Sequence, residues 1–169
     1  MTLRIGILTV SDRSSRGERP DTSGPALESA VIAQGWSVAQ KAIVPDDRTA
    51  IQDTLASWAD AGQVDVVLTT GGTGFSPRDV TPEATLAVVE RQAPGIAEAM
   101  RLASLKVTPH AMLSRAVAGI RGRTLIVNLP GSPKGALENL EVILPVLPHA
   151  VELLKEAPGA EAGHGKTKS

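Results

Sequence analysis

The chain has 169 residues, of which 42% are hydrophobic and 21% are charged, and these ordinary values exclude a collagen-like repeat and wholesale disorder. Its net charge of −1 gives no overall field that would attract nucleic acid, so we expect no nucleic-acid partner. The absence of cysteine excludes a thiolate nucleophile, a disulfide framework and a cysteine-ligated cluster.

The amino-terminal part of the chain alternates between short apolar segments and helical patterns. Residues 3–10 are apolar and β-branched, which predicts a buried strand followed by a polar loop over residues 11–17. Residues 25–35 repeat apolar side chains at helical spacing and end at a glycine, so they predict a helix. Residues 36–44 alternate as a second strand would.

The next part of the chain repeats this order. Asp47 is the expected N-cap of a second helix, and residues 64–70 predict a third strand that runs into a glycine-rich loop. A helix should follow that loop, with Thr81 as its N-cap and Pro82 at its first helical position. Residues 94–105 predict a further helix.

The carboxyl-terminal part predicts a pair of strands and a bent helix. Residues 115–119 and 123–128 flank a short turn, and the second of these segments contains a strong buried strand. Residues 137–154 carry apolar side chains at helical intervals. Pro145 and Pro148 interrupt this pattern, so we expect a bend or two shorter helices.

The chain is long enough for one domain, which would bury about two thirds of the surface that its unfolded form exposes. We assign this domain to residues 1–156. Residues 157–169 are small, polar and rich in glycine, without an apolar stripe, and we expect a disordered tail there.

Strands that alternate with helices predict an α/β fold with a mostly parallel sheet covered on both faces. In such sheets ligands bind outside the carboxyl ends of the strands, near the switch in strand order. Four loops should therefore meet at one rim: residues 11–13, 45–47, the glycine-rich loop, and 128–131.

The glycine-rich loop is the main candidate for a phosphate site. Gly71 and Gly72 permit close approach of the backbone to a ligand, and the Thr70 and Thr73 hydroxyls and Gly74 lie beside them. Backbone N–H groups and the start of the following helix can hold phosphate oxygens. The alternative is a tight strand-to-helix turn that uses glycine only for its positive φ.

Carboxylates at the same rim favour a magnesium site. Asp79 precedes the helix start, and a second carboxylate, Asp46 or Asp47, should lie nearby. A pair of carboxylates beside a phosphate cradle is typical of Mg²⁺ that bridges phosphate oxygens. The alternative is that Asp79 only favours the helix dipole or pairs with an arginine.

Other polar residues on the rim could contact a ligand. Asn128 could read a heterocycle or phosphate, and the turn at Pro130 and Gly131 brings backbone close to it; the alternative is a simple strand terminator. Ser114 and Arg115 could supply a hydroxyl and a positive charge, although arginines are commonly only solvated.

Several motifs occur in an order that resembles the MogA/MoaB molybdopterin-binding family, over about residues 3 to 155. The chain is also similar to the G domains of gephyrin and its plant counterpart. The residues that carry the resemblance are 8–12, 21–25, 44–47, 69–84, 111–115, 118–122 and 128–131.

The resemblance implies a three-layer α/β sandwich around a mostly parallel sheet, assembled as a homotrimer that binds molybdopterin and MgATP. It implies a molybdopterin adenylyltransferase, a nucleotidyltransferase that moves AMP from ATP to the phosphate of molybdopterin and releases pyrophosphate in molybdenum cofactor biosynthesis. It also implies a molybdenum-insertase partner.

The resemblance gives roles to the rim residues. It makes Asp46, in preference to Asp47, and Asp79 the catalytic residues and the Mg²⁺ ligands, directly or through water. The residues expected to bind molybdopterin or nucleotide are Thr70, Gly71, Gly72, Thr73, Gly74, Ser114, Arg115, Asn128, Pro130 and Gly131.

Two alternatives to catalysis stay open at this point. One is a molybdopterin carrier or scaffold of the MoaB type that binds ligand without turnover, and the other is a nucleotide-binding regulatory protein. No stretch reaches the roughly 20 apolar residues of a membrane span and no signal peptide is recognisable, so we expect a cytoplasmic protein.

Overall fold

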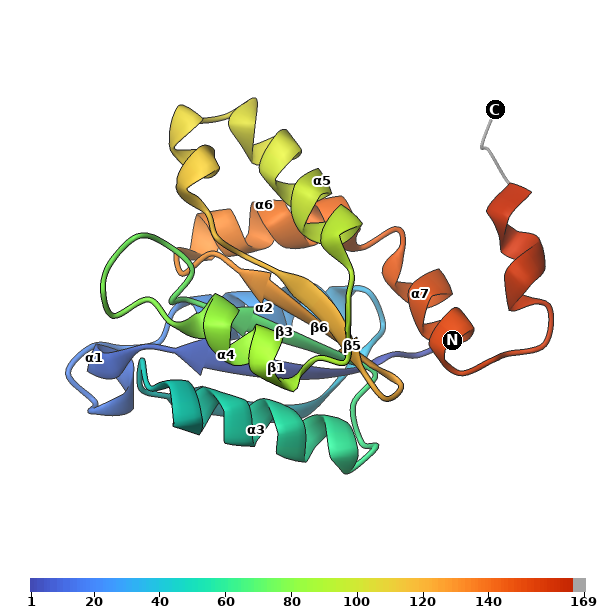
Figure 1. Cartoon of the computed structure of the whole chain (residues 1–169), viewed down its shortest axis with the longest axis horizontal. Coiled ribbons are helices and arrows are strands. Elements are labelled where there is room, and N and C mark those ends of the chain that lie inside the picture. Colours follow the sequence, from blue (N-terminus) through green and yellow to red (C-terminus); the bar gives the residue numbers. More distant parts are fainter. Residues whose placement is uncertain (166–169) are drawn as a thin grey trace.

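The computed structural model describes residues 1–165 and is built on one six-stranded sheet between two layers of helices (Figure 1). The strand order is β2-β1-β3-β6-β5-β4. The strands in chain order are β1 (Arg4–Val10), β2 (Ser37–Val44), β3 (Val66–Thr70), β4 (Arg91–Gln92), β5 (Ala118–Arg121) and β6 (Thr124–Leu129).

The described residues also form α-helices and two 3₁₀ helices. The helices in chain order are α1 (Asp12–Ser15), α2 (Ser23–Ala33), α3 (Arg48–Asp60), α4 (Thr81–Val88), α5 (Pro94–Leu105), η1 (Pro109–Leu113), α6 (Pro133–Ile143), α7 (Leu147–Leu154) and η2 (Ala160–Gly165). No helix in the described part of the chain is long and apolar enough to span a membrane.

Successive side chains of a strand point to opposite faces of the sheet, and helices pack on both faces, which gives three layers. In β1, Ile5 and Ile7 pack into a core with α2, α5, α6 and α7, whereas Leu8 and Val10 pack on the other face against α3 and α4. Figure 1 shows α5 and α6 above the sheet and α3 below it. Because both faces are covered, the central strands are apolar on both sides. The predicted three-layer α/β sandwich is confirmed.

The four predicted loops do meet at one rim. β2, β1, β3 and β6 are parallel, and Thr9 pairs with Thr70, which in turn pairs with Leu129 of β6. The carboxyl ends of these strands are thus level. β2 lies on one side of β1 and β3 on the other, so the strand order switches direction between β1 and β3. This switch is where a parallel α/β sheet offers a ligand site.

Most of the helix boundaries follow the sequence signals. Asp47 caps α3, accepting a hydrogen bond from the backbone N–H of Ala50 at 2.8 Å, as predicted. The segment predicted as a bent helix forms α6 and α7, which are separated by a turn that contains Pro145. The predicted helix over residues 94–105 is also confirmed.

Three local predictions were wrong or incomplete. Thr81 is the first helical residue and not the N-cap, because its hydroxyl donates to the Gly71 carbonyl at 2.9 Å and Val80 takes the cap position. The loop over residues 11–17 contains the short helix α1, since the Ser11 side chain accepts from the Ser14 N–H. The sequence did not predict β4 or η1, which are too short for a periodic pattern.

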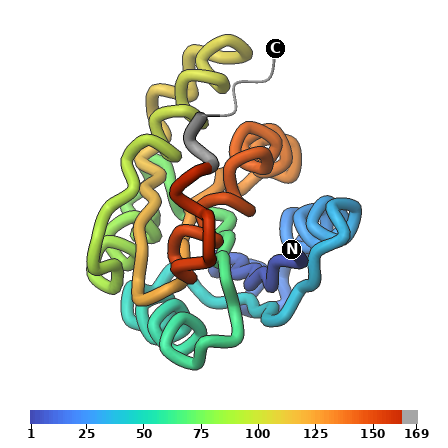
Figure 2. Tube along the Cα trace, turned by 90° about the vertical axis from the view of Figure 1, so that its right-hand side faces the viewer, coloured from blue at the N-terminus to red at the C-terminus, as the bar shows by residue number. Residues whose placement is uncertain are grey.

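The short helix η2 lies on the side of the molecule away from α1 (Figure 1) and faces the viewer in Figure 2. Part of the expected tail is described, and it forms η2, in which Ala160 is buried. Residues 166–169 lie outside the described part of the chain. A disordered tail over residues 157–169 stays a prediction.

A buried carboxylate ties this end of the molecule together. One Asp65 oxygen accepts from Arg4 Nη2 at 2.7 Å and from Lys155 Nζ at 2.9 Å, and the other accepts from the Arg4 backbone N–H at 2.8 Å. Burial by itself raises the pKa of Asp65, but the hydrogen bonds from Arg4 and Lys155 outweigh it and lower that pKa to about 2. The ionised form therefore joins β1, the start of β3 and the end of α7.

Asp65→Asn should lower the free energy of unfolding at pH 7 by roughly 2 kcal/mol, because the folded state then loses a carboxylate whose pKa it depresses. The contribution of Asp65 is present above its unfolded pKa, near 4, and is lost as pH falls toward 2. Urea unfolding followed by circular dichroism from pH 7 to pH 2.5 measures it. The stability difference between the two proteins should narrow below pH 4, and a constant difference would contradict the assignment. Asp60→Asn is the control and should have a much smaller effect, because the Asp60 side chain is 60% exposed in its ion pair with Arg121.

Candidate functional site

A cavity of about 280 Å³, here called the polar cavity, lies beyond the carboxyl ends of β1 and β3. It occupies the switch in strand order described above. The predicted site residues that line it are Asp46, Thr70, Gly71, Gly72, Asp79 and Gly131. Residues from all four loops therefore meet around one polar space.

The glycine loop is shaped by close contact with its neighbours. Gly71 has a φ of +102° and Gly72 has a φ of +69°, in the region that favours glycine. A Cβ at Gly71 would lie 2.3 Å from the Val10 carbonyl oxygen, and one at Gly72 would lie 2.3 Å from the Thr81 hydroxyl. Side chains at these positions would collide with the rim itself. The glycines thus let the loop backbone fold against the end of β1.

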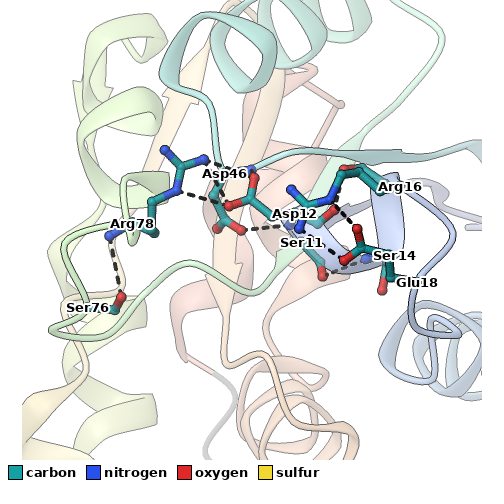
Figure 3. A network of polar contacts seen from close by, with 9 residues as sticks. Ser11, Asp12, Ser14, Arg16, Glu18, Asp46, Ser76 and Arg78 are labelled. Atoms are coloured by element: carbon teal, nitrogen blue, oxygen red, sulfur yellow. Dashed lines mark hydrogen bonds and ion pairs between the residues drawn. The ribbon is translucent and has the colours of Figure 1, made fainter.

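Asp46 is held by an exchange of hydrogen bonds with Asp12. The Asp12 backbone N–H donates to the Asp46 carboxylate, and the Asp46 backbone N–H donates to the Asp12 carboxylate, both at 2.9 Å. Arg78 donates to both Asp12 carboxylate oxygens at 3.0 Å (Figure 3). Residues from three rim loops are therefore linked through two carboxylates and one guanidinium.

The two carboxylates in this pair have opposite pKa shifts. Burial raises the pKa of Asp46, and the negative charges of Asp12 and Asp79 raise it further. Burial would also raise the pKa of Asp12, but hydrogen bonds from Arg78 and the Asp46 backbone lower it overall. Burial and the neighbouring carboxylates therefore disfavour the charged form of Asp46, and the Asp12 backbone N–H and Arg78 offset this only in part.

Asp79 is stabilised within its own loop. One of its carboxylate oxygens accepts from the Ser76 backbone N–H at 3.0 Å, and the Asp79 backbone N–H donates to the Ser76 carbonyl at 2.9 Å. This local turn places the carboxylate just before α4. Asp79 also lies near enough to raise the pKa of Asp46 through its charge.

A second cavity of about 300 Å³, here called the adjoining cavity, lies between η1 and the start of α6. Its wall includes apolar side chains such as Val107 and Leu113. The predicted residues that line it are Thr73, Gly74, Ser114 and Pro130. Ser132 lines both cavities, so the glycine loop and residues 130–132 lie between two neighbouring spaces.

The side chains of two predicted binding residues, Asn128 and Arg115, form hydrogen bonds with other residues of the protein. Asn128 is fully buried, where its amide nitrogen donates to Thr69 and Thr85 and its oxygen accepts from the Val117 N–H. Arg115 donates to backbone carbonyls of the glycine loop and pairs with Glu83. Neither residue lines either cavity, so the structure places them as supports of the site.

The sequence reading missed Asp12, Asp21 and Ser23 as site residues. Asp21 lines the polar cavity, accepting from the Thr9 hydroxyl at 2.8 Å and from a backbone N–H of α2, and the Ser23 hydroxyl donates to the Gly131 carbonyl at 2.5 Å. The sequence feature that could have pointed to these three residues is the run of polar residues between the first strand and the first long helix. Which of them turn inward depends on the packing of α2 against its neighbours.

The carboxylates of Asp46 and Asp79 suit a Mg²⁺ ion that is also bound by a substrate phosphate. They do not suit a metal ion held by protein side chains alone. Among residues 1–165, no group of three or more histidine, aspartate or glutamate side chains is arranged to hold a metal ion. Mg²⁺ is commonly bound by one or two carboxylates together with waters and substrate phosphates. Asp46 and Asp79 both line the polar cavity, so two carboxylates face one space, which suits that arrangement.

Comparisons with known proteins agree on one family. A family model described as "Probable molybdopterin binding domain" matches residues 6–149. The chain is 44% identical over 155 residues to the molybdopterin adenylyltransferase of Helicobacter pylori (strain J99), covering 90% of this chain and 88% of that protein. It is 46% identical over 164 residues to gephyrin of Dictyostelium discoideum, covering 91% of this chain but only 23% of gephyrin.

A solved structure has the same fold. The molybdopterin biosynthesis enzyme MoaB from Thermus thermophilus superposes with a TM-score of 0.87 at 54% identity, covering 93% of this chain and 99% of that one. The likeness therefore runs over nearly the full length of both chains.

Gly71→Ala should destabilise the protein by about 2 kcal/mol or more, because it combines a strained φ with a clash against the Val10 carbonyl. Gly122→Ala is the control, since Gly122 has a φ of +56° but a Cβ there would meet no atom within 4 Å. Its cost should be about 1 kcal/mol, from the backbone alone. Thermal unfolding compares the two. Equal stabilities for both variants would show that the contact with β1 is unimportant.

Proposed function

The chain belongs to the family of the probable molybdopterin binding domain, and from that premise we propose that it is a molybdopterin adenylyltransferase of molybdenum cofactor biosynthesis. The observation that carries the proposal is the pair of cavities that share the glycine loop as a wall. A reaction between two phosphorylated molecules needs adjoining sites of this kind.

The proposed reaction joins the phosphate of molybdopterin to the α-phosphorus of ATP. An oxygen of the molybdopterin phosphate forms the new P–O bond, and the bond from the α-phosphorus to the bridging oxygen of the β-phosphate breaks. Pyrophosphate leaves with that electron pair. The products are adenylylated molybdopterin and pyrophosphate, so atoms and charge balance without an oxidant or reductant.

The protein's task in this reaction is alignment of two anions that repel each other. The Gly71 N–H donates to the Leu129 carbonyl, so the phosphate contacts in this proposal fall to other backbone N–H groups of the glycine loop, such as that of Gly72, which lines the polar cavity. Holding the attacking oxygen in line with the phosphorus removes most of the entropic cost of their meeting. Fixed donors also stabilise charge that develops on the phosphoryl oxygens.

We assign Mg²⁺ to the carboxylates of Asp46 and Asp79, directly or through water. When bound, the ion neutralises phosphate charge and orients the triphosphate. Burial and the charges of Asp12 and Asp79 raise the pKa of Asp46, and a divalent cation beside these carboxylates would offset both effects, which supports this assignment. Asp12 would keep Asp46 in place through their exchanged hydrogen bonds.

The remaining parts of the proposal follow from the same family membership. We propose a cytoplasmic homotrimer that uses Mg²⁺, ATP and molybdopterin and passes its product to a molybdenum-insertase partner. The alternative is a carrier or scaffold that binds molybdopterin without turnover. The carboxylates lining the polar cavity favour the enzyme, because a carrier would not need to hold a metal-bound triphosphate.

Asp79→Asn and Asp46→Asn should each lower the turnover number by about 100-fold or more, while molybdopterin binding is retained, because each removes a charge that holds Mg²⁺. The matched control is Asp47→Asn. Asp47 is the neighbouring carboxylate and serves as the N-cap of α3, a role that asparagine also fills, so activity should persist. Pyrophosphate release with purified molybdopterin, ATP and Mg²⁺ measures turnover. Tight molybdopterin binding by the wild-type protein with no pyrophosphate released would reject the enzyme and leave the carrier.

A further inference from the structure

We propose that Arg115 is a positioning residue that fixes both ends of the segment formed by residues 74–79, and through it the carboxylate of Asp79. This inference rests on the proposed role of Asp79 and goes beyond it. It gives Arg115 a task different from binding substrate phosphate. The segment of residues 74–79 is called the Asp79 segment below.

A single guanidinium group binds the first and last residues of the Asp79 segment. Arg115 Nε donates to the Gly74 carbonyl at 2.7 Å, and its Nη2 donates to the Asp79 carbonyl at 2.7 Å. The Arg115 backbone N–H donates to the Thr73 carbonyl at 2.8 Å, directly before the segment. Since the group is planar and rigid, these bonds set the distance between the two ends of the segment.

The third nitrogen of the Arg115 guanidinium group links Arg115 to α4. Nη1 forms an ion pair with Glu83, which lies in the first turn of that helix. Burial would raise the pKa of Glu83, but the hydrogen bond from Arg115 lowers it overall, so the pair is charged at neutral pH. All three nitrogens of Arg115 therefore have partners within the protein, and Arg115 lines neither cavity.

The anchored segment carries the groups that shape the polar cavity. Asp79 occupies its last position, and the neighbouring Arg78 reaches across to Asp12, which exchanges hydrogen bonds with Asp46. Arg78 is 65% exposed and Arg115 is 33% exposed. Exposed ion pairs contribute little to stability, so Arg115 is the stronger of the two restraints. A shift at either end of the segment would move Asp79 relative to Asp46.

The choice of replacement distinguishes positioning from charge. Lysine keeps the positive charge, but its single ammonium group cannot bond to Gly74, Asp79 and Glu83 in the same planar geometry. If Arg115 bound a substrate phosphate, Arg115→Lys would retain much more activity than Arg115→Gln. If Arg115 positions the segment, both variants should lose activity to a similar extent.

Arg121 offers a matched control at the far end of the molecule. It also pairs with a carboxylate, through two hydrogen bonds to Asp60, and it also donates to a backbone carbonyl, that of Val88. Its side chain is 27% exposed, close to the value for Arg115. Arg121→Gln therefore removes a similar structural interaction without touching the rim.

Hydrogen exchange of the backbone amides in the Asp79 segment tests the inference without any ligand or turnover. Exchange there should be at least about 10-fold faster in Arg115→Gln and in Arg115→Lys than in the wild type, because the carbonyl bonds that close the segment are lost. Arg121→Gln should leave it unchanged. Unchanged exchange in the folded Arg115→Lys protein would overturn the inference, whatever the catalytic result.

Kinetics then test whether the restraint acts through Asp79. Both Arg115 variants should lower kcat by about 10- to 100-fold, with a smaller change in KM for ATP and a higher Mg²⁺ requirement. In an Asp79→Asn background, Arg115→Gln should have little further effect, since coupled residues are not additive. Full additivity of the two substitutions, or an Arg115→Lys variant that keeps its activity, would overturn the inference.

A wild-type protein that shows no turnover would reject the proposed function. The hydrogen-exchange measurement would still decide the role of Arg115.

Discussion

The contact between Gly71 and the Val10 carbonyl governs the shape of the whole rim. A side-chain atom at Gly71 has no room beside the end of β1, so the backbone of the glycine loop lies directly against it. From that point the loop turns toward α4, where the Thr81 hydroxyl binds the Gly71 carbonyl. Parallel pairing already places the loop after β3 beside those after β1 and β2, and this close approach sets the glycine loop against the end of β1, at the edge of the polar cavity.

Three aspartates, Asp21, Asp46 and Asp79, line this cavity, and Asp12 lies beside Asp46. Asp12 has its charge compensated by Arg78, whereas Asp46 has a raised pKa because it is buried among carboxylates. One aspartate therefore has its charge compensated by an arginine, and its neighbour is the one that we propose as a ligand of Mg²⁺. Their exchanged hydrogen bonds keep the two roles on adjacent loops.

The two ends of the sheet have different tasks. At the amino ends, Asp65 has a strongly lowered pKa because Arg4 and Lys155 compensate its buried charge, which stabilises the folded chain. At the carboxyl ends, polar groups and glycines with positive φ surround the polar cavity, which is the candidate binding site. The arginines of the rim, Arg78 and Arg115, hold loops in place, as Arg4 holds the opposite end.

The sequence alone determined the four parallel strands of the sheet and which loops share its rim, because periodicity and glycine or proline signals are local and parallel strands end at a common edge. The sequence did not determine which individual polar side chains face the cavities and which bond to other residues of the protein. Asn128 and Arg115 looked like ligand groups, yet their partners lie 59 and 41 residues away in the chain, at Thr69 and Gly74. Only the packing of β3, β6 and α4 decided that these polar groups meet protein atoms, because hydrogen bonds between distant segments have no signature in local sequence.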